Sequence, residues 1–471
     1  MPRTNNPHAP LSILMALAAA SLTASLGISI ASVLLPTLTG SFGVTVSQSQ
    51  WVILAYLMAV TVTIVSAGRL GDLFGHRRLM VLGLVVFLGA SVLGAVAPTL
   101  GLLILARALQ GLGASIMIAL PMSIARDMVP SGQLGTVMGL LGTTSAAGTA
   151  LGPSLGGLAL AWGDWRMAFW LLAGFATLAL ALAGMVIRPD SRPPRASFRS
   201  LDLPGTFVLI VALTAYSLGT SGGASVVAVS PVVLLATALF AIAIFAAVEA
   251  RVDMPLVPIA VLMDRMTGAR IAMNFLICTV MMATLVVGPF FLTFFLELNA
   301  AVVGLVLAVG PVVAACSGVP AGRLTDRYGA QRMMLAGLMQ TIVGLLCLAF
   351  LPRFFGVGGY IAALIGLTPG FQMFLAANNT AVMSAASKEE RGRLSGLLGL
   401  SRNLGLMTGA SAMSTLFVAV MGTGDAAKAP IADVAHGFTV TFLTAAVLAM
   451  IAMWLAIWSN PTRHQTVLEP G

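Results

Sequence analysis

The residues of this sequence best suited to chemistry are two arginines inside long apolar segments, Arg107 and Arg402. Gln110 and Gly111 lie on the same helical face as Arg107, because they follow it by three and four residues. A charged side chain within a membrane span costs from ~3 to more than 10 kcal/mol, so it faces the protein interior and indicates a functional site. The alternative for Arg107 is a side chain that extends to the membrane surface from near the helix end.

No carboxylate accompanies these arginines, since residues 1–71 contain neither Asp nor Glu. Without a buried acid there is no obvious proton carrier and no counter-charge for a lipophilic cation, which favours a neutral or anionic solute. Polar side chains in the apolar segments are candidates for lining a solute cavity, and hydrogen bonding between helices is the alternative role. These candidates are Ser25, Ser29, Ser32, Tyr56, Gln340, Gln372, Asn378 and Asn379.

A short charged segment, 68–78, lies between two apolar segments, and a close copy follows at 322–332. We call these segments the gate hairpins. Their aspartates, Asp72 and Asp326, are 254 residues apart. Glycines permit a tight turn, and an acid beside arginines forms ion pairs that break when the helices rearrange. We therefore predict a gating role, and not contact with solute, for Gly68, Asp72, Gly75, Arg77, Arg78, Gly322, Asp326, Gly329 and Arg332.

The composition indicates that these segments lie in lipid. Hydrophobic residues make up 59% of the chain and charged residues 8%, against about 25% charged residues in soluble domains. A span needs ~20 apolar residues, and lipid requires backbone groups to be bonded within each segment, which favours helices. We expect an all-α polytopic membrane protein with fourteen spans, near residues 11–36, 50–68, 79–97, 100–122, 133–157, 165–187, 204–221, 230–250, 269–295, 300–321, 333–351, 355–381, 393–420 and 437–459.

Basic residues orient these spans, because Lys and Arg concentrate in cytoplasmic loops. With the N-terminus inside, 19 of the 24 Lys and Arg fall in inner segments and 3 in outer ones. We therefore expect a multi-pass protein of the cell (inner) membrane with both termini in the cytoplasm. The same rule explains the net charge of +9 without a nucleic-acid partner.

The repeated gate hairpin predicts a duplicated bundle. The offset of 254 residues relates the first six spans to the last six and leaves the seventh and eighth as an inserted, peripheral pair. The expected parts are an N-terminal six-helix half (11–190), the inserted pair (200–252) and a C-terminal six-helix half (267–460). Parallel repeats of this kind bind their solute between the halves near the middle of the membrane.

Span 133–157 contains Gly148, Gly152 and Gly156, which form a stripe without side chains for close helix packing. Pro153 removes a backbone hydrogen bond and bends the helix. Gly157 completes the string Gly-x-x-x-Gly-Pro-x-x-Gly-Gly.

Together these motifs resemble the major facilitator superfamily, specifically its fourteen-helix drug:proton antiporter branch. The gate hairpins resemble its loop signature, Arg107-x-x-Gln110-Gly111 its arginine motif, and the glycine string the motif that marks exporters. Asp164-Trp165-Arg166 and Asp202-Leu203-Pro204-Gly205 are also typical of the branch. The resemblance implies a secondary exporter of small amphipathic or drug-like compounds that works by alternating access and is coupled to protons. One feature departs from it, because Gly27 stands where the branch carries an acid.

Two alternatives to this function stay open. One is an importer or facilitator of a neutral or anionic organic solute without proton antiport, and the other, from a different class, is a membrane sensor. An enzyme is not expected, because His, Cys and acidic residues show no catalytic or metal-ligand spacing. The expected partners are a small-molecule substrate, the lipid bilayer and, through the resemblance, protons. We expect a monomer without a cofactor or metal.

Overall fold

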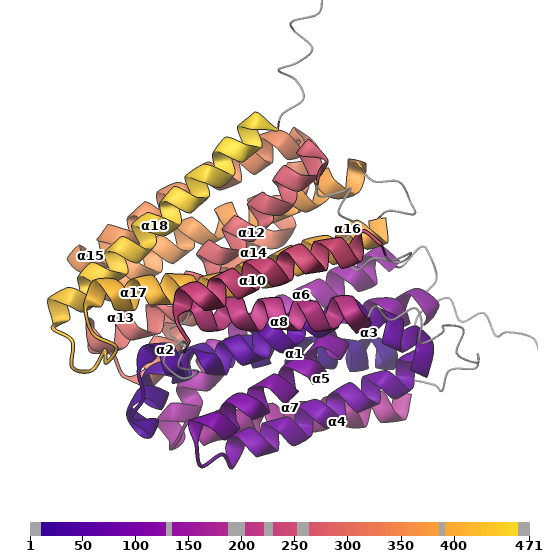
Figure 1. Ribbon diagram of the computed structural model, residues 1–471, viewed down its shortest axis with the longest axis horizontal. Helices are drawn as coiled ribbons and strands as arrows, with labels where there is room; N and C mark the ends of the chain where they lie inside the picture. Colours follow the sequence, from indigo (N-terminus) through magenta and orange to yellow (C-terminus); the bar gives the residue numbers. More distant parts are fainter. Residues whose placement is uncertain are drawn as a thin grey trace, which may run out of the picture. The chain divides into compact units, whose positions relative to one another are not determined.

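The computed structural model describes residues 11–128, 134–186, 203–220, 229–251, 263–385 and 391–459, and its regular elements in these ranges are helices (Figure 1). Their bounds are α1 Leu11–Phe42, α2 Val46–Ser49, α3 Trp51–Phe74, α4 His76–Ala95, α5 Leu100–Met128, α6 Leu134–Trp162, α7 Arg166–Val186, α8 Leu203–Thr220, α10 Pro231–Glu249, α12 Arg265–Val286, α13 Gly288–Phe294, α14 Ala300–Tyr328, α15 Ala330–Ala385, α16 Arg391–Thr408, a π-helical turn Gly409–Met413, α17 Ser414–Met421 and α18 Ile431–Trp458.

Eleven helices of the described residues are long and apolar enough to cross a membrane, so the prediction of an all-helical polytopic protein is confirmed. The predicted number of fourteen spans is not reached. Two differences have a plain origin: α8 offers only a short apolar segment, Pro204–Thr220, and α15 contains one candidate span of 55 residues, Ala330–Ser384, which counts once. The prediction that the first span ends at Pro36 is wrong, because α1 continues through this proline to Phe42.

Helix α15 consists of two arms that pack against each other. Gly356 interrupts it with the non-helical angles φ 56° and ψ −134°. A Cβ atom on Gly344 would lie 2.5 Å from Leu367 Cα, and one on Gly337 would lie 2.6 Å from Phe374 N. Because the paired positions run in opposite directions away from the turn, the arms form an antiparallel hairpin. Each arm coincides with one expected span, 333–351 or 355–381.

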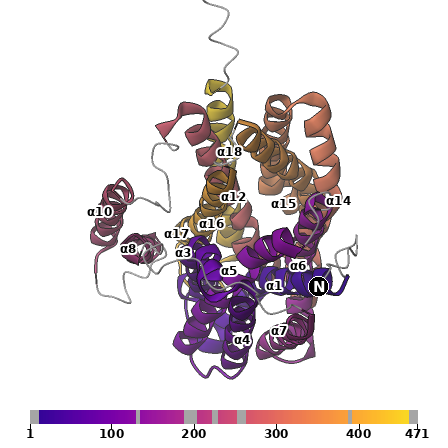
Figure 2. The ribbon, with the colours of Figure 1, turned by 90° about the vertical axis from the view of Figure 1, so that its right-hand side faces the viewer.

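The chain divides into two compact units. Unit 1 comprises Met1–Tyr216 and Leu298–Pro311, and unit 2 comprises Ser217–Glu297 and Val312–Gly471. In unit 1, α1 packs along α6, α3 along α5, and α4 along both α5 and α7; α4 and α7 lie side by side in both ribbon views (Figures 1 and 2). In unit 2, α12 packs against α16 and α18, and α15 against α18.

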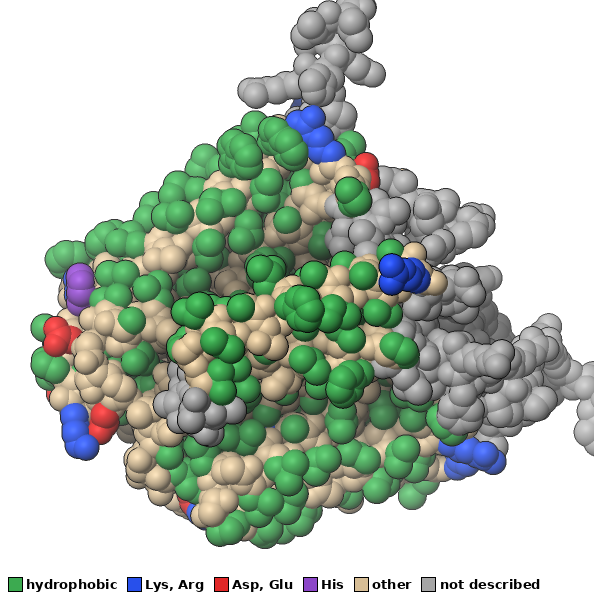
Figure 3. Space-filling view, viewed as in Figure 1, with side chains coloured by type: hydrophobic (Ala, Val, Ile, Leu, Met, Phe, Trp, Pro, Cys, Tyr) green, Lys and Arg blue, Asp and Glu red, His purple; other side chains and the backbone are tan. Residues whose placement is uncertain are grey.

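Helix α10, the second helix of the expected inserted pair, is mostly exposed. Val232, Leu239 and Phe240 are 76%, 70% and 68% exposed, and hydrophobic side chains dominate this surface (Figure 3). A hydrophobic surface of this kind fits contact with lipid. The helix is attached to unit 2 in part through Phe245, which packs against a buried cluster on α12 and α16. The division of the chain into an N-terminal half (11–190), an inserted pair (200–252) and a C-terminal half (267–460) stays a prediction.

The two gate hairpins have the same backbone turn. Gly75 ends α3 with φ 90°, and Gly329, 254 residues later, separates α14 from α15 with φ 86°. The Gly75 N–H donates to Gly71 O at 2.9 Å, and the Gly329 N–H donates to Thr325 O at 3.0 Å. The repeat seen in the sequence is therefore also a repeat of conformation.

Alanine at either turn should destabilise the protein. Gly75 has φ 90° and ψ 136°, a conformation that L-residues other than glycine rarely adopt, and backbone strain of this kind costs of order 1–3 kcal/mol. Gly75→Ala and Gly329→Ala should each lower the free energy of unfolding by about this amount, measured by denaturant unfolding in detergent micelles. Gly89→Ala is the matched control, because its Cβ would meet nothing within 4 Å inside helix α4. An equal loss in all three variants would contradict the assigned backbone strain.

Candidate functional site

Arg107 lies in the interior of unit 1 with none of its surface exposed. Its Nε donates to Val52 O at 2.8 Å, its Nη1 to Gln110 Oε1 at 2.7 Å, and its Nη2 to Gly27 O at 2.7 Å. The side chain thus joins α5 to α3 and α1. It does not extend to a surface, which was the alternative left open by the sequence.

The ring of Tyr56 completes the surroundings of Arg107. The guanidinium carbon lies 4.3 Å from the ring centroid, and a cation over an aromatic face gains ~2 kcal/mol when desolvated. The Tyr56 hydroxyl donates to Ala24 O at 2.7 Å. Gly27 leaves room for this arrangement, since a Cβ there would lie 3.0 Å from the Tyr56 hydroxyl oxygen and 3.1 Å from Phe87 Cζ. The space beside Gly27, the position where the fourteen-helix branch carries an acid, is therefore filled by the rings of Tyr56 and Phe87.

Gln110 extends the network to α4. Its Nε2 donates to Ser91 Oγ at 2.7 Å, and Ser91 in turn donates to Phe87 O at 2.7 Å. Gly111 lies against α3 so closely that a Cβ there would clash with the carbonyl oxygen of Tyr56. In this motif Arg107 supplies the charge and Gln110 supplies the amide that orients it. Gly111, which has no side chain, allows α5 and α3 to pack closely.

The glycine stripe of α6 packs on α1. A Cβ on Gly148 would lie 2.5 Å from Leu22 O, and one on Gly152 would overlap Ser29 Oγ. Gly156 meets the same helix at Ile30 O, at 2.9 Å. The close packing predicted for these three glycines is therefore present, and its partner is α1.

Gly157 lies on another side of α6, against the first turns of α14 that belong to unit 1. A Cβ on Gly157 would lie 2.7 Å from Ala300 O, and one on Gly304 would clash with Pro153 O. Two helices thus approach α6 at glycines, as the string Gly-x-x-x-Gly-Pro-x-x-Gly-Gly requires.

Two of the candidate serines of α1 face α6. Ser25 Oγ lies 2.6 Å from Ser145 Oγ, and Ser29 donates to Ser25 O at 3.3 Å and to Gly148 O at 3.5 Å. Ser32 donates to Ser29 O at 2.7 Å, within α1 itself. All three serines are buried, and the structure places Ser25 and Ser29 at a helix contact, the alternative role given for them above.

In each gate hairpin a side chain bonds to the end of a later helix, α7 for the first copy and α18 for the second. Arg77 Nη2 donates to Gly184 O near the end of α7 at 3.0 Å. Gln331 Nε2 donates to Ala456 O near the end of α18 at 2.8 Å. Arg77 and Gln331 are 254 residues apart, so an amide in the second copy makes the contact that a guanidinium makes in the first.

The other gate residues are less constrained. Gly68 and Asp72 lie in the last two turns of α3, and their surroundings are outside the described part of the structure. Gly322 is half-buried, and the exposed members are Arg78, Asp326, Gly329 and Arg332. Asp326 forms no ion pair with any residue that the structure describes, so the predicted pairing of acid and arginine is not present at the second copy.

The candidates of unit 2 do not converge on one site. Gln340 donates to Gly366 O at 3.0 Å across the α15 hairpin. Asn378 is buried and donates to Arg270 O at 3.2 Å, while its Oδ1 meets no donor among the described residues. Arg402 and Asn379 are exposed and Gln372 is half-buried. The structure therefore brings together Tyr56, Arg107, Gln110 and Gly111 of unit 1 and leaves the candidates of unit 2 dispersed.

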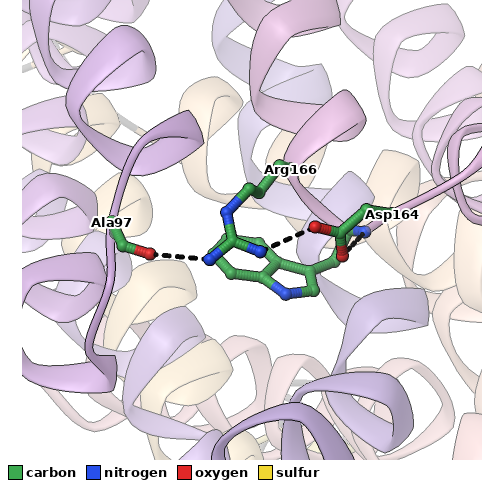
Figure 4. Close-up of polar contacts among 4 residues, drawn as sticks. Ala97, Asp164 and Arg166 are labelled. Carbon is green, nitrogen blue, oxygen red and sulfur yellow. Dashed lines mark hydrogen bonds and ion pairs between the residues drawn. The ribbon is translucent and has the colours of Figure 1, made fainter.

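The segment Asp164-Trp165-Arg166 fastens the start of α7 to the end of α4 (Figure 4). Arg166 pairs with Asp164 at 2.7 Å and donates to Ala97 O at 3.2 Å. The ion pair is 40% and 47% exposed, and exposed pairs contribute at most about 1 kcal/mol. Trp165 is buried beneath the guanidinium, 4.3 Å from its carbon, so this motif has a packing role.

Sequence reasoning missed three members of the Arg107 network: the carbonyl groups of Gly27 and Val52 and the hydroxyl of Ser91. Backbone acceptors carry no signal in residue type. Ser91 is one of many serines in apolar segments, and nothing in its spacing points to Gln110.

Membrane-spanning helices around a buried intramembrane arginine define the class as a polytopic transport protein, because such residues mark solute or ion pathways. A family model described as the Major Facilitator Superfamily matches residues 17–296 and 271–470. The chain belongs to the major facilitator superfamily and is a transporter of that superfamily.

Its relatives include drug-resistance proteins and a riboflavin transporter. The transporter YebQ of Escherichia coli (strain K12) is 30% identical over 90% of this chain and 90% of its own length. The puromycin resistance protein pur8 of Streptomyces alboniger is 30% identical over 97% and 93%. The riboflavin transporter RibZ of Clostridioides difficile (strain 630) is 26% identical over 81% and 82%.

Solved structures show the same fold. A bacterial homologue of the human lysosomal transporter Spinster superposes with a TM-score of 0.70 at 14% identity, over 98% of this chain and all of that one. The xylose transporter XylE of E. coli superposes with a TM-score of 0.63 at 13% identity, over 95% of this chain and 99% of its own. At these identities the likeness concerns the fold alone.

Proposed function

We propose that this transporter is a secondary exporter of small amphipathic compounds that works by alternating access. The observation that carries the proposal is the glycine contact of α6 with α1, because the string Gly148–Gly157 resembles the motif of exporters and makes close helix contacts at Gly148, Gly152 and Gly156. The relatives named for puromycin and multidrug resistance support export of drug-like compounds. Another relative is named as a riboflavin transporter, so organic solutes other than drugs are also candidate substrates.

We propose fourteen spans for this exporter. Separating the arms of α15 and adding α6 and α8 to the eleven candidate spans gives this number, which is typical of the drug:proton antiporter branch. We propose the inner membrane as its location, and the distribution of arginine and lysine supports an orientation with both termini in the cytoplasm. We propose that the carrier works as a monomer, with the gate hairpins at its cytoplasmic side.

The resemblance also implies proton coupling, for which the residues give little support. An antiported proton needs a titratable carrier in the path, and α1 contains no ionisable residue at all. Arg107 stays charged at physiological pH, because a guanidinium does not lose its proton in proteins. We therefore propose export as the primary function; proton coupling, which the resemblance implies, finds no titratable carrier in α1.

Compound accumulation in cells tests the direction of transport. A drug-sensitive bacterium producing the protein should hold several-fold less puromycin or riboflavin at steady state than cells with the vector alone. The variant Arg107→Ala should restore the level of the vector. Higher accumulation in producing cells would establish import in place of export, and unchanged accumulation of both compounds would contradict the choice of solutes drawn from the relatives.

A further inference from the structure

The buried charge of unit 1 is positive and has no acidic partner among the side chains that the structure describes. Arg107 is bonded to Val52 O, Gly27 O and Gln110 Oε1 and lies over the ring of Tyr56. All four of these partners are neutral. Hydrogen bonds and an aromatic face orient the guanidinium, but they do not cancel its unit charge.

The sequence shows where acidic residues are absent from unit 1, including positions whose side chains the structure does not describe. Residues 73–126 contain no acid, and α1 and α6 contain no ionisable residue. The acids of residues 1–216 are Asp72, Asp127, Asp164, Asp190 and Asp202. Asp72 and Asp127 lie in the last turn of a helix, Asp164 just precedes α7, and the other two fall between α7 and α8. None lies in the middle of a span.

Unit 2 repeats the pattern with Arg402. This arginine lies in the interior of helix α16 and is exposed, and no ion pair joins it to any residue that the structure describes. Glu249 is the buried carboxylate among the described residues, and it is the last residue of α10. The spans of both units thus hold a positive charge well inside them and acids only near their ends.

A charge in a low-dielectric interior acts over long distances, because neither water nor salt screens it effectively. Arg107 therefore influences a solute that does not touch it. A permanently cationic solute is repelled at every position along the path, whereas an anionic solute is attracted. Such fields raise the local concentration of the matching ion by factors of ten or more.

We propose that the cargo of this transporter is an organic anion, selected by the unpaired charges of Arg107 and Arg402 and driven outward by the membrane potential. The inference rests on the proposed function as an exporter. An anion is expelled by a cell interior that is negative, and for a single charge each ~59 mV corresponds to a tenfold concentration ratio. Export of an anion therefore needs no proton-carrying carboxylate, which agrees with the absence of one from the middle of these spans.

Three naphthalene probes of matched size test the proposal: 1-naphthalenesulfonate (anion), 1-naphthalenesulfonamide (neutral) and trimethyl-1-naphthylammonium (cation). Purified protein in liposomes receives a potassium gradient and valinomycin, which sets the potential, at equal pH on both sides. The anion should accumulate on the positive side in a protein-dependent manner, approaching tenfold for each ~59 mV. Its initial rate should exceed that of the cation at least tenfold.

Variants assign the effect to the buried charge. Arg107→Gln should lower the rate of anion transport at least tenfold, while Arg107→Lys, which keeps the charge, should retain more of it. Arg353→Gln is the control, because Arg353 is exposed and forms no side-chain hydrogen bond with the described residues; its anion transport should equal that of the unchanged protein.

Each failure has a separate meaning. Transport of the cation at a rate equal to that of the anion, or accumulation of the anion that does not change with the imposed potential, would overturn the proposed anion selectivity and leave export standing. Protein-dependent movement of none of the three probes would overturn both the inference and the proposed transport of amphipathic compounds.

Discussion

Arg107→Ala should lower the rate of solute transport about a hundredfold while the protein remains folded and inserted. The arginine is the point where α1, α3 and α5 meet through its three hydrogen bonds. A hundredfold loss corresponds to ~2.7 kcal/mol of transition-state free energy. The stability change should be small, because removing a buried charge also removes its desolvation cost, which offsets the lost hydrogen bonds.

The measurement combines initial transport rates in liposomes with size-exclusion profiles and thermal unfolding of the same preparation. Arg166→Ala is the control, since this arginine forms an exposed ion pair with Asp164 at the start of α7 and should retain most of the transport. A folded Arg107→Ala protein with unchanged rates would show that the buried arginine is a packing residue only.

The largest effect on stability is expected from Gly152→Leu. A Cβ at this position would overlap Ser29 Oγ and lie 2.8 Å from the backbone nitrogen of Ile30. Because that nitrogen belongs to the backbone of α1, the two helices must separate along their whole contact. Overpacking typically costs 1–3 kcal/mol, and here we expect a loss of about 3 kcal/mol or more in the free energy of unfolding.

Gly174→Leu provides the matched control, because a Cβ on Gly174 in α7 would meet nothing within 4 Å. Denaturant unfolding and the yield of monodisperse protein should separate the two variants clearly. Equal stability would mean that α1 and α6 do not approach each other as closely as described.

Much of the architecture could be predicted from sequence, because lipid allows few alternatives. Long apolar segments must be helices, and the repeated glycines Gly75 and Gly329 give the same turn twice. Helix ends were less predictable. Pro36 does not stop α1, since a proline removes one hydrogen bond and the rest of the helix compensates. The arms of α15 fall where spans were expected, but the tight turn at Gly356 was not foreseen.

The candidate site was predictable where residue type alone decides. A charged arginine in an apolar helix was expected to face the interior; Arg107 does, whereas Arg402 is exposed. The partners of Arg107 depend on how α1 and α3 are aligned with α5, which spacing within one helix does not reveal. For the same reason the serines of α1 could be named as cavity candidates, but the contact of Ser25 and Ser29 with α6 became known only from the packing of the two helices.

The central claim is that this protein carries solute by alternating access, and a counterflow measurement in liposomes tests it most directly. Liposomes are loaded with excess unlabelled 1-naphthalenesulfonate and diluted into a trace of the radiolabelled compound, without a pH gradient or membrane potential. A carrier exchanges inner for outer solute, so the label should rise transiently above its final level and then decay, and this overshoot should be absent in Arg107→Ala. A monotonic approach to equilibrium would indicate a pore, and uptake equal to that of protein-free liposomes would contradict transport of this compound.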